Sequence, residues 1–176
     1  MGHDITETPP PGRHEPHDPE HLLPCRARSC DVVGVFVVDA GGRVLLQERD
    51  DHAPVAAEQW GIVGGHVEPG EEWPVAMRRE LLEETGIDAE PGQLVIWYDG
   101  DHTPETKTEP DLRNRWQIWV GRMDLRDEDI VCGEGRQIVF VDPRDRDGLD
   151  LAESTAYFLP RFLGSDLSRE LSRAPR

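Results

Sequence analysis

Short hydrophobic runs bounded by polar or glycine-rich segments dominate the chain, and each run predicts a β-strand. The first two form the clearest pair, because the turn sequence DAGG at 39–42 joins them in the manner of a hairpin. The third run, QWGIV, is short and ends in a glycine pair. The predicted strands cover residues 31–38, 43–49, 59–63, 93–99, 116–123 and 137–141.

Two segments carry helical signals. One helix is predicted from near Pro74, since proline is favoured in a first turn, to a left-handed cap at Gly86. A second is predicted over residues 151–163, with a bend at Pro160. Strands outnumber helices, and the best-marked helix lies between strands in the sequence. We therefore expect an α/β (α+β) fold in which a mixed β-sheet is sandwiched between helices.

The first 24 residues differ in composition from the rest, being rich in Pro, His, Glu and Asp. This composition cannot bury a hydrophobic core, so residues 1–24 are predicted to form an acidic arm and residues 25–176 the folded domain. No apolar run approaches the roughly 18 residues that span a bilayer, and the N-terminus lacks the pattern of a signal peptide. A cytoplasmic location is therefore expected.

The chain has 36% hydrophobic and 31% charged residues, as in ordinary globular proteins, but its formal net charge is −17. Such an acidic chain repels nucleic acid polymers and anionic membranes, so we expect neither as a partner. A small phosphate-bearing molecule is compatible with this charge if a divalent cation screens it, and so is a homodimer. Cys25, Cys30 and Cys132 are expected to be free cytosolic thiols, with a Cys25–Cys30 disulfide as the alternative.

The predicted central helix crowds three carboxylates onto one face. At about 100° per residue, Glu80, Glu83 and Glu84 lie together, while Leu81 and Leu82 are expected to point away towards a core. Like charges at this spacing destabilise a helix by a few tenths of a kcal/mol, and a hard cation such as Mg²⁺ would offset that cost. The alternative is a solvated acidic face without a ligand.

The residues that flank these glutamates favour the metal-binding interpretation. Gly65 is followed after five residues by Glu71, and after seven more by the sequence RELLEETGI, which begins at Arg79. This spacing is that of the Nudix box, and the chain resembles the Nudix hydrolase family over residues 65–87. The resemblance implies a Nudix-type αβα sandwich with the box loop and helix in the middle, and hydrolysis of a nucleoside diphosphate linked to another group.

The resemblance also implies roles for individual residues. Glu80, Glu83, Glu84 and the backbone carbonyl of Gly65 match metal ligands, with Mg²⁺ or Mn²⁺ as the cofactor. Glu83, Glu84 and Arg79 form the implied catalytic set, in which Arg79, like Glu71, orients the loop and the helix. An arginine beside several glutamates can hold their rotamers through forked hydrogen bonds. His66 occupies a variable position of the box and is expected to be an exposed loop residue.

A further acidic residue lies outside the box. Glu134 and Gly135 precede a predicted strand, as a Glu-Gly pair does in MutT-like Nudix enzymes, which implies an additional metal ligand or general base. Gly133 and Gly135 would give the backbone freedom to swing Glu134 inward. Asp127, Glu128 and Asp129 are the alternative candidates, and a solvated acidic loop is the alternative without function.

The sequence says less about the substrate. Trp97, Tyr98, Trp116 and Trp119 are expected in the core rather than against a nucleobase, with Trp97 and Tyr98 on opposite faces of a strand. The predicted function is a MutT-like, metal-dependent pyrophosphohydrolase acting on a (d)NTP or a nucleotide derivative. The alternative is a non-hydrolytic Nudix-fold module that binds or senses a nucleotide. Such modules usually lose box glutamates, and none is missing here.

Overall fold

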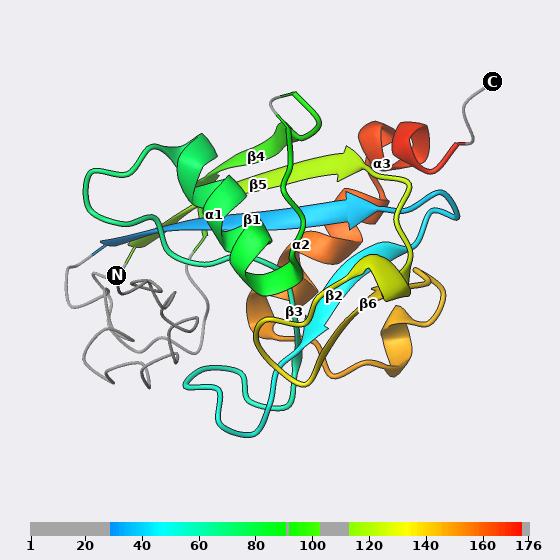
Figure 1. Cartoon of the computed structure of the whole chain (residues 1–176), viewed down its shortest axis with the longest axis horizontal. Coiled ribbons are helices and arrows are strands. Elements are labelled where there is room, and N and C mark those ends of the chain that lie inside the picture. The colour runs from blue at the N-terminus through cyan, green and yellow to red at the C-terminus, as the bar shows by residue number, and fades with distance from the viewer. Residues whose placement is uncertain (1–28, 91, 103–112, 174–176) are drawn as a thin grey trace, which may run out of the picture.

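The structure is a computed structural model that describes residues 29–90, 92–102 and 113–173. Within these ranges the chain forms one six-stranded sheet with helices on both faces (Figure 1). The helices are α1 (Trp73–Thr85), α2 (Glu153–Leu163) and α3 (Asp166–Leu171). The strands are β1 (Ser29–Val38), β2 (Val44–Glu48), β3 (Trp60–Gly61), β4 (Val95–Asp101), β5 (Arg113–Arg122) and β6 (Gln137–Val141).

The sheet is mixed, as predicted. Its order is β3-β2-β1-β5-β4, and β6 pairs with β2 outside this path. β1 and β5 run parallel over ten residue pairs, whereas the other strand pairs are antiparallel. β1 and β5 are therefore the long central strands, and the short strands β2, β3 and β6 gather beside the hairpin end of β1.

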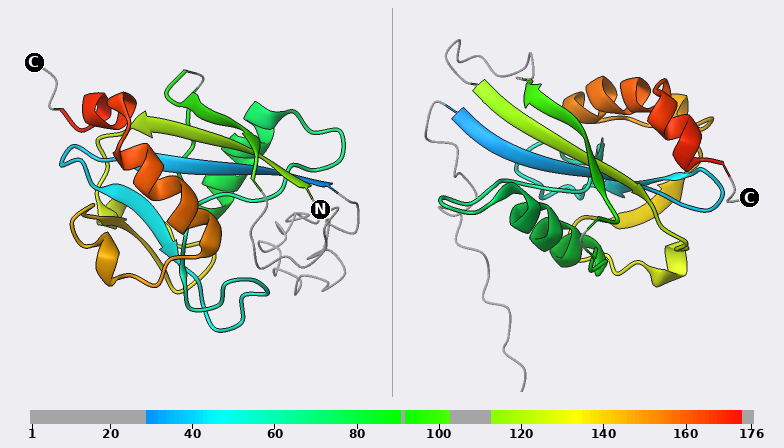
Figure 2. Two further views of the ribbon diagram at one scale, coloured as in Figure 1. Left: turned by 180° about the vertical axis from the view of Figure 1, so that it is seen from behind. Right: turned by 90° about the horizontal axis from the view of Figure 1, so that it is seen from above.

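Helices cover both faces of the sheet, with α1 on one side and α2 and α3 on the other (Figure 2). Alternate residues of β1 divide between two cores: Val33 and Val35 pack in the cluster that contains Leu81 of α1, whereas Phe36 packs in the cluster that contains Phe162 of α2. Because β1 is buried on both faces, it reads in the sequence as a continuous hydrophobic run. The expected αβα sandwich is confirmed.

The predicted elements agree with the structure except in detail. The boundaries of most strands and helices shift by a few residues, and α2 continues through Pro160. Helix α3 was not predicted, since its sequence DLSREL offers only two apolar residues. Leu81 is fully buried but Leu82 is 45% exposed, so the expectation that both face the core is wrong for Leu82. One residue along a helix turns the side chain by about 100°, which is enough to leave the core.

The prediction that Trp97 and Tyr98 face opposite ways is also wrong. A register shift in the β4–β5 ladder between Ile96 and Tyr98 marks a β-bulge, and the extra residue breaks the alternation. Both aromatic rings pack on α2: Trp97 lies edge-on to Phe162 with centroids 5.5 Å apart, and Tyr98 lies edge-on to Phe158 at 5.0 Å. These two rings belong to the core of the α2 face.

The structure also tests the predictions for two tryptophans and two cysteines. Trp116 and Trp119 are buried, each 9% exposed, as predicted for core residues. Cys132 is a free thiol, but Cys30 is disulfide-bonded, so the free-thiol expectation is wrong for Cys30. Cys25 and the predicted arm of residues 1–24 lie outside the described residues. In the part of the chain that is described, no helix combines the length and the apolar character needed to cross a membrane.

Candidate active site

The glycine pair before α1 lies tightly against β1. Val35 N–H donates to Val63 O at 2.8 Å, and Val33 N–H donates to Gly65 O at 2.9 Å. Gly64 has φ +135°, and a Cβ there would lie 2.2 Å from Val33 O, so only glycine fits. A Cβ on Gly65 would lie 2.6 Å from a Glu80 carboxylate oxygen. The two glycines thus allow the α1 carboxylates to reach the backbone of the box loop.

Arg79 connects the loop to the helix. Its guanidinium forms a two-pronged ion pair with Glu71, with Nε and Nη2 each 2.9 Å from a carboxylate oxygen. Nη1 donates to Glu80 at 2.8 Å and to Glu83 at 3.4 Å, and Nη2 also donates to the backbone carbonyl of His66 at 3.0 Å. The hydrogen bonds from Arg79 lower the pKa of Glu71. In turn, Glu71 and Glu80 raise the pKa of Arg79. His66 is half-buried rather than exposed as expected.

Two of the box carboxylates are largely withdrawn from water. Glu84 is 6% exposed, and one of its carboxylate oxygens accepts a hydrogen bond from Gly64 N–H at 3.0 Å. Burial raises the pKa of Glu84 to about 8, and the nearby carboxylates of Glu134 and Glu80 add to the effect. Burial also raises the pKa of Glu80, against the opposing influence of Arg79. Glu83 is different, because 61% of its side chain is exposed.

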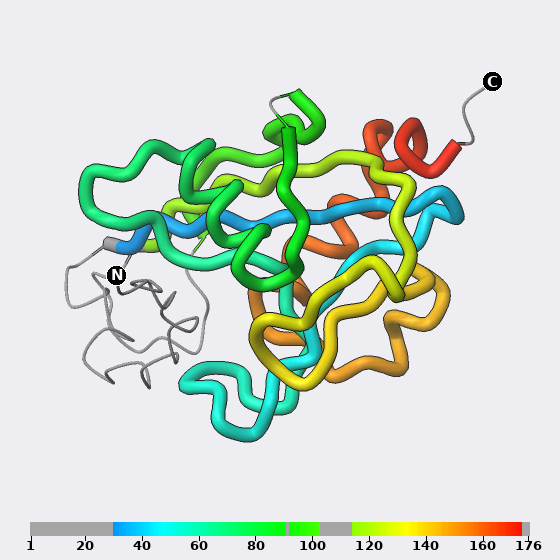
Figure 3. Tube along the Cα trace, in the orientation of Figure 1, coloured from blue at the N-terminus to red at the C-terminus, as the bar shows by residue number. Residues whose placement is uncertain are grey.

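Glu134 reaches this cluster from the loop between β5 and β6. Figure 3 shows that loop passing beside the C-terminal end of α1 and along β2. Gly133 N–H donates to Glu84 O at 2.8 Å, and Arg136 N–H donates to Glu48 O at 2.7 Å. The Glu134 carboxylate lies 3.8 Å from Nη2 of Arg49.

The glycines around Glu134 have a role other than the expected freedom of movement. A Cβ on Gly133 would lie 2.1 Å from Glu83 O, and a Cβ on Gly135, where φ is +82°, would lie 2.7 Å from Glu48 O. Both positions require glycine because the loop is clamped between α1 and β2 at close range. The glycines serve close packing of the backbone, and this packing brings Glu134 to the cluster.

The competing acidic residues have structural partners elsewhere. Asp127 accepts a hydrogen bond from Phe140 N–H at 2.7 Å and pairs with Arg43 at 3.5 Å. Asp129 accepts from Arg126 N–H, and Glu128 pairs with the Arg126 side chain. These three residues form a short 3₁₀-helix, Asp127–Asp129, at the edge of the sheet. Their contacts account for their positions without a role beside Glu84.

Two residues of the site escaped the sequence analysis, namely Gln47 and Arg49. Gln47 is fully buried in β2, and its Nε2 donates to Glu134 O at 3.0 Å. Arg49 follows β2 and has a buried Nε without a hydrogen-bond partner among the described residues. The available signal was the polar end of the run VLLQER, in which a glutamine occupies a core-facing position after three apolar residues.

The donor set suits a hard divalent cation. Glu80, Glu83, Glu84 and Glu134 supply carboxylate oxygens, and Gly65 O keeps a lone pair beyond its bond to Val33. Two buried carboxylates with raised pKa values are costly to ionise, and a bound cation offsets that cost. The described residues contain no group of three acidic, His or Cys side chains already gathered around one point. Arg79 instead holds Glu80, so binding a cation would require these side chains to rearrange.

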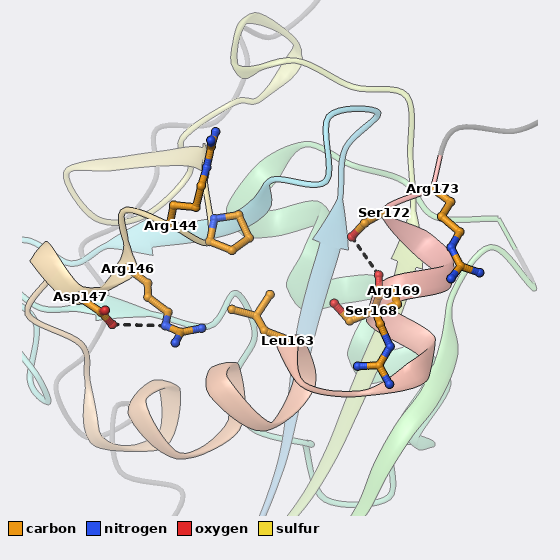
Figure 4. A pocket seen from close by; sticks show the side chains of 9 residues that line it. Arg144, Arg146, Asp147, Leu163, Ser168, Arg169, Ser172 and Arg173 are labelled. Atoms are coloured by element: carbon orange, nitrogen blue, oxygen red, sulfur yellow. Dashed lines mark hydrogen bonds and ion pairs between the residues drawn. The ribbon is translucent and has the colours of Figure 1, made fainter.

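One hollow borders this cluster, and a second lies away from it. The first, of about 640 Å³, runs along α1 and is lined largely by apolar residues such as Val75, Leu82 and Trp119, with Arg79 and Glu83 of the cluster also in its lining. The other, of about 660 Å³, lies on the α2–α3 face and is lined by four arginines, of which Figure 4 shows Arg146 directed at Leu163. Three of those arginines already pair with nearby aspartates: Arg144 with Asp142, Arg146 with Asp147, and Arg169 with Asp166.

Comparison with known proteins agrees with this geometry. The family model described as NUDIX domain matches residues 28–162, so the chain belongs to the Nudix family. Over 82% of this chain and 96% of the other, the fold is similar to that of a MutT protein from Methanosarcina mazei Go1, with a TM-score of 0.63 and 22% identity. That similarity concerns the fold alone.

Curated relatives share more of the sequence. An RNA pyrophosphohydrolase of Caulobacter vibrioides is 37% identical over 105 residues, which cover 56% of this chain and 60% of the relative. A dihydroneopterin triphosphate diphosphatase of Escherichia coli is 33% identical over 111 residues, covering 63% of this chain and 70% of the relative. The match to the first of these therefore spans about three fifths of that protein's length.

Proposed function

We propose that this chain is a divalent-metal-dependent pyrophosphohydrolase that cleaves a phosphoanhydride bond in a small nucleotide or nucleotide-like triphosphate. The observation that carries the proposal is the packing of the Glu80 and Glu84 carboxylates against Gly65 and Gly64, with Arg79 bridging Glu71 and Glu80. Buried, ionised carboxylates destabilise the metal-free protein. A hard cation with its phosphate ligand would offset this loss of stability.

In this proposal the residues of the chain have separate tasks. Glu80, Glu83, Glu84 and the carbonyl of Gly65 would hold Mg²⁺ or Mn²⁺. When bound, such an ion neutralises phosphate charge and makes an attacking water more acidic. Arg79 orients the box loop and the helix by its paired hydrogen bonds. Glu134, from the loop before β6, would accept the proton of the water or complete the set of ligands.

Arg49 supplies a second positive charge near the acidic cluster, beside Glu134, in addition to Arg79. Its side chain is 22% exposed, its Nε is buried without a partner among the described residues, and its Nη2 lies 3.8 Å from Glu134. A partly exposed guanidinium beside the acidic cluster is suited to a phosphate oxygen. Arg49 is therefore the proposed phosphate-binding residue, and it would orient the group that leaves.

A small substrate is favoured over RNA because of charge. The net charge of −17 disfavours a polyanion, since each additional phosphate outside the cation site adds repulsion. The names of the relatives nevertheless include RNA pyrophosphohydrolases, so a 5′-triphosphorylated RNA is the second candidate. Both candidates share the same chemistry, the release of pyrophosphate or phosphate from a terminal triphosphate.

The test is a release assay for pyrophosphate and phosphate in the presence of Mg²⁺ or Mn²⁺, with EDTA as the control. The substrates are the dNTPs, dihydroneopterin triphosphate, nucleotide sugars, dinucleoside polyphosphates and a short 5′-triphosphorylated RNA. We expect turnover of a small triphosphate that EDTA abolishes, and weak turnover of the RNA. Thermal stabilisation by a nucleotide without hydrolysis of any substrate would favour the non-hydrolytic binding module and contradict the proposal.

A further inference from the structure

Gln47 is a polar residue at a core position. Its side chain is 0% exposed, and it lies two residues after Leu45 in β2, so both side chains point to the α1 face of the sheet. Leu45 belongs to the hydrophobic cluster beneath α1. Burial of an amide is costly unless its polar atoms are hydrogen-bonded, and Oε1 of Gln47 has no partner among the described residues. Packing alone would favour an apolar side chain here.

The other half of the amide has a specific contact. Nε2 of Gln47 donates to the backbone carbonyl of Glu134 at 3.0 Å, across 87 residues of sequence. The opposite orientation of the amide would place Oε1 against that carbonyl oxygen, so the hydrogen bond determines which atom faces the loop. The Cys132 thiol also approaches the same carbonyl, at 3.3 Å.

This contact acts on Glu134 itself. Backbone hydrogen bonds hold Gly133 to α1 and Arg136 to β2. These two bonds leave the orientation of the Glu134 peptide, which lies between them, to other contacts. The Glu134 side chain is 60% exposed, and its carboxylate forms a long ion pair with Arg49. The direction in which the Glu134 carboxylate projects therefore depends on its backbone, and the hydrogen bond from Gln47, together with the contact from Cys132, orients the carbonyl of that backbone.

We propose that Gln47 is a positioning residue, which orients the peptide of Glu134 so that the Glu134 carboxylate faces Glu84 across the cation site. The inference rests on the proposed function, in which Glu134 is the base or an additional ligand. Gln47 itself lies beneath the loop and acts through Glu134. A shift of about 1 Å in a group of this kind can lower the rate by up to about a hundredfold.

The test replaces Gln47 by methionine, which keeps the length of the side chain and removes the amide. Gln117→Met is the matched control: Gln117 is buried in β5, its Nε2 donates to Asp99 at 3.0 Å, and its Oε1 also has no partner among the described residues. We expect Gln47→Met to lower kcat about tenfold with little change in KM, and Gln117→Met to leave kcat unchanged. Equal effects of the two variants would assign Gln47 a merely structural role.

A double-mutant cycle with Glu134→Gln identifies the route of the effect. If Gln47 acts through Glu134, the double variant has the kcat of Glu134→Gln alone. The inference would be overturned if the two substitutions lower kcat multiplicatively, or if Gln47→Met leaves kcat unchanged. If Glu134→Gln leaves kcat unchanged while Glu83→Gln is inactive, Glu134 has no role in turnover and the inference about Gln47 fails. The proposed function would still stand in that case.

A second cycle measures the affinity for Mn²⁺ by its magnetic resonance signal and needs no turnover. If the chain hydrolyses nothing, the proposed function fails, and this cycle still decides whether Gln47 and Glu134 act together at the cation site. Equal and non-additive losses of Mn²⁺ affinity in Gln47→Met and Glu134→Gln support the inference. Additive losses of Mn²⁺ affinity contradict the inference, and so does a Gln47→Met variant in which both kcat and Mn²⁺ affinity are unchanged.

Discussion

Replacing Glu84 by glutamine should stabilise the metal-free protein and flatten the dependence of its stability on pH. The pKa of Glu84 rises from 4.5 to about 8 on folding, chiefly because the carboxylate is buried. The folded state therefore binds more protons than the unfolded state between these pH values, so the free energy of unfolding falls as pH rises through this window. Below about pH 4.5 the penalty is absent, and above about pH 8 it is complete.

The magnitude follows from about 1.4 kcal/mol per pH unit inside that window. Between pH 6 and pH 7.5, ionisation of Glu84 should cost the folded state about 2 kcal/mol, and at pH 7 the total is about 3 kcal/mol. Glutamine has no such cost and can keep the hydrogen bond from Gly64 N–H. Its buried NH₂ group offsets part of the gain, by about 1–2 kcal/mol if it finds no partner. The change with pH is therefore a cleaner measure than the absolute stability.

Urea denaturation of the parent and of Glu84→Gln in EDTA, at pH 6 and pH 7.5, measures this change. The parent should lose about 2 kcal/mol more than the variant, equivalent to a fall in Tm of several degrees. Burial raises the pKa of Glu80 in the parent, and Glu84→Gln keeps the side-chain volume that buries it, so the comparison isolates Glu84. Saturating Mg²⁺ should reverse the trend in the parent, because the ionised carboxylate binds the cation. Parallel pH profiles for the two proteins in EDTA would refute the assignment of a buried, costly carboxylate.

Further predictions follow from the same site. Glu83→Gln and Glu84→Gln should each lower turnover about 10²-fold or more at saturating Mg²⁺ while the far-UV circular dichroism is unchanged, and near-parental turnover in both would contradict their assignment as ligands. Glu134→Gln should lower kcat about 10- to 10³-fold in steady-state kinetics. Asp127→Asn should lower kcat much less than Glu134→Gln does, but should lower the melting temperature more. Arg79→Lys should lower kcat despite keeping the charge, since lysine cannot form the two-pronged bond to Glu71. Deletion of residues 1–24 should leave Tm within a few degrees of the parent, and a large fall would show that this segment is structural.

The box residues were predictable because their interactions are local in sequence. On α1, Glu83 lies three residues after Glu80 and four after Arg79, so helical periodicity alone places it beside both. Glu71 is only eight residues from Arg79, and the loop between them is short enough for the ion pair to close. The family resemblance supplied Gly65, whose proximity to Glu80 is explained by the close approach that its missing Cβ allows.

The contacts that were missed are those between segments far apart in the sequence. The bond from Gln47 to Glu134 joins residues 87 positions apart, and nothing in the local pattern of β2 shows that β6 lies beside it. The bulge at Trp97 depends on the register against β5, which a single strand does not reveal. The same limit explains the glycines at 133 and 135, whose close neighbours are backbone atoms of α1 and β2.

The glycines at 133 and 135 change how the acidic cluster is understood. Flexibility of the loop would let Glu134 avoid the other carboxylates in the free protein. Clamped glycines instead hold Glu134 near Glu84, where it adds to the rise in the pKa of Glu84. The fold thus keeps Glu134 and Glu80 near the buried Glu84 before any cation arrives, and the hydrophobic packing of α1 against β1 provides the stability that this requires. Cation affinity and metal-free stability are therefore opposed at this site, so a substitution that relieves the repulsion should stabilise the fold and weaken cation binding together.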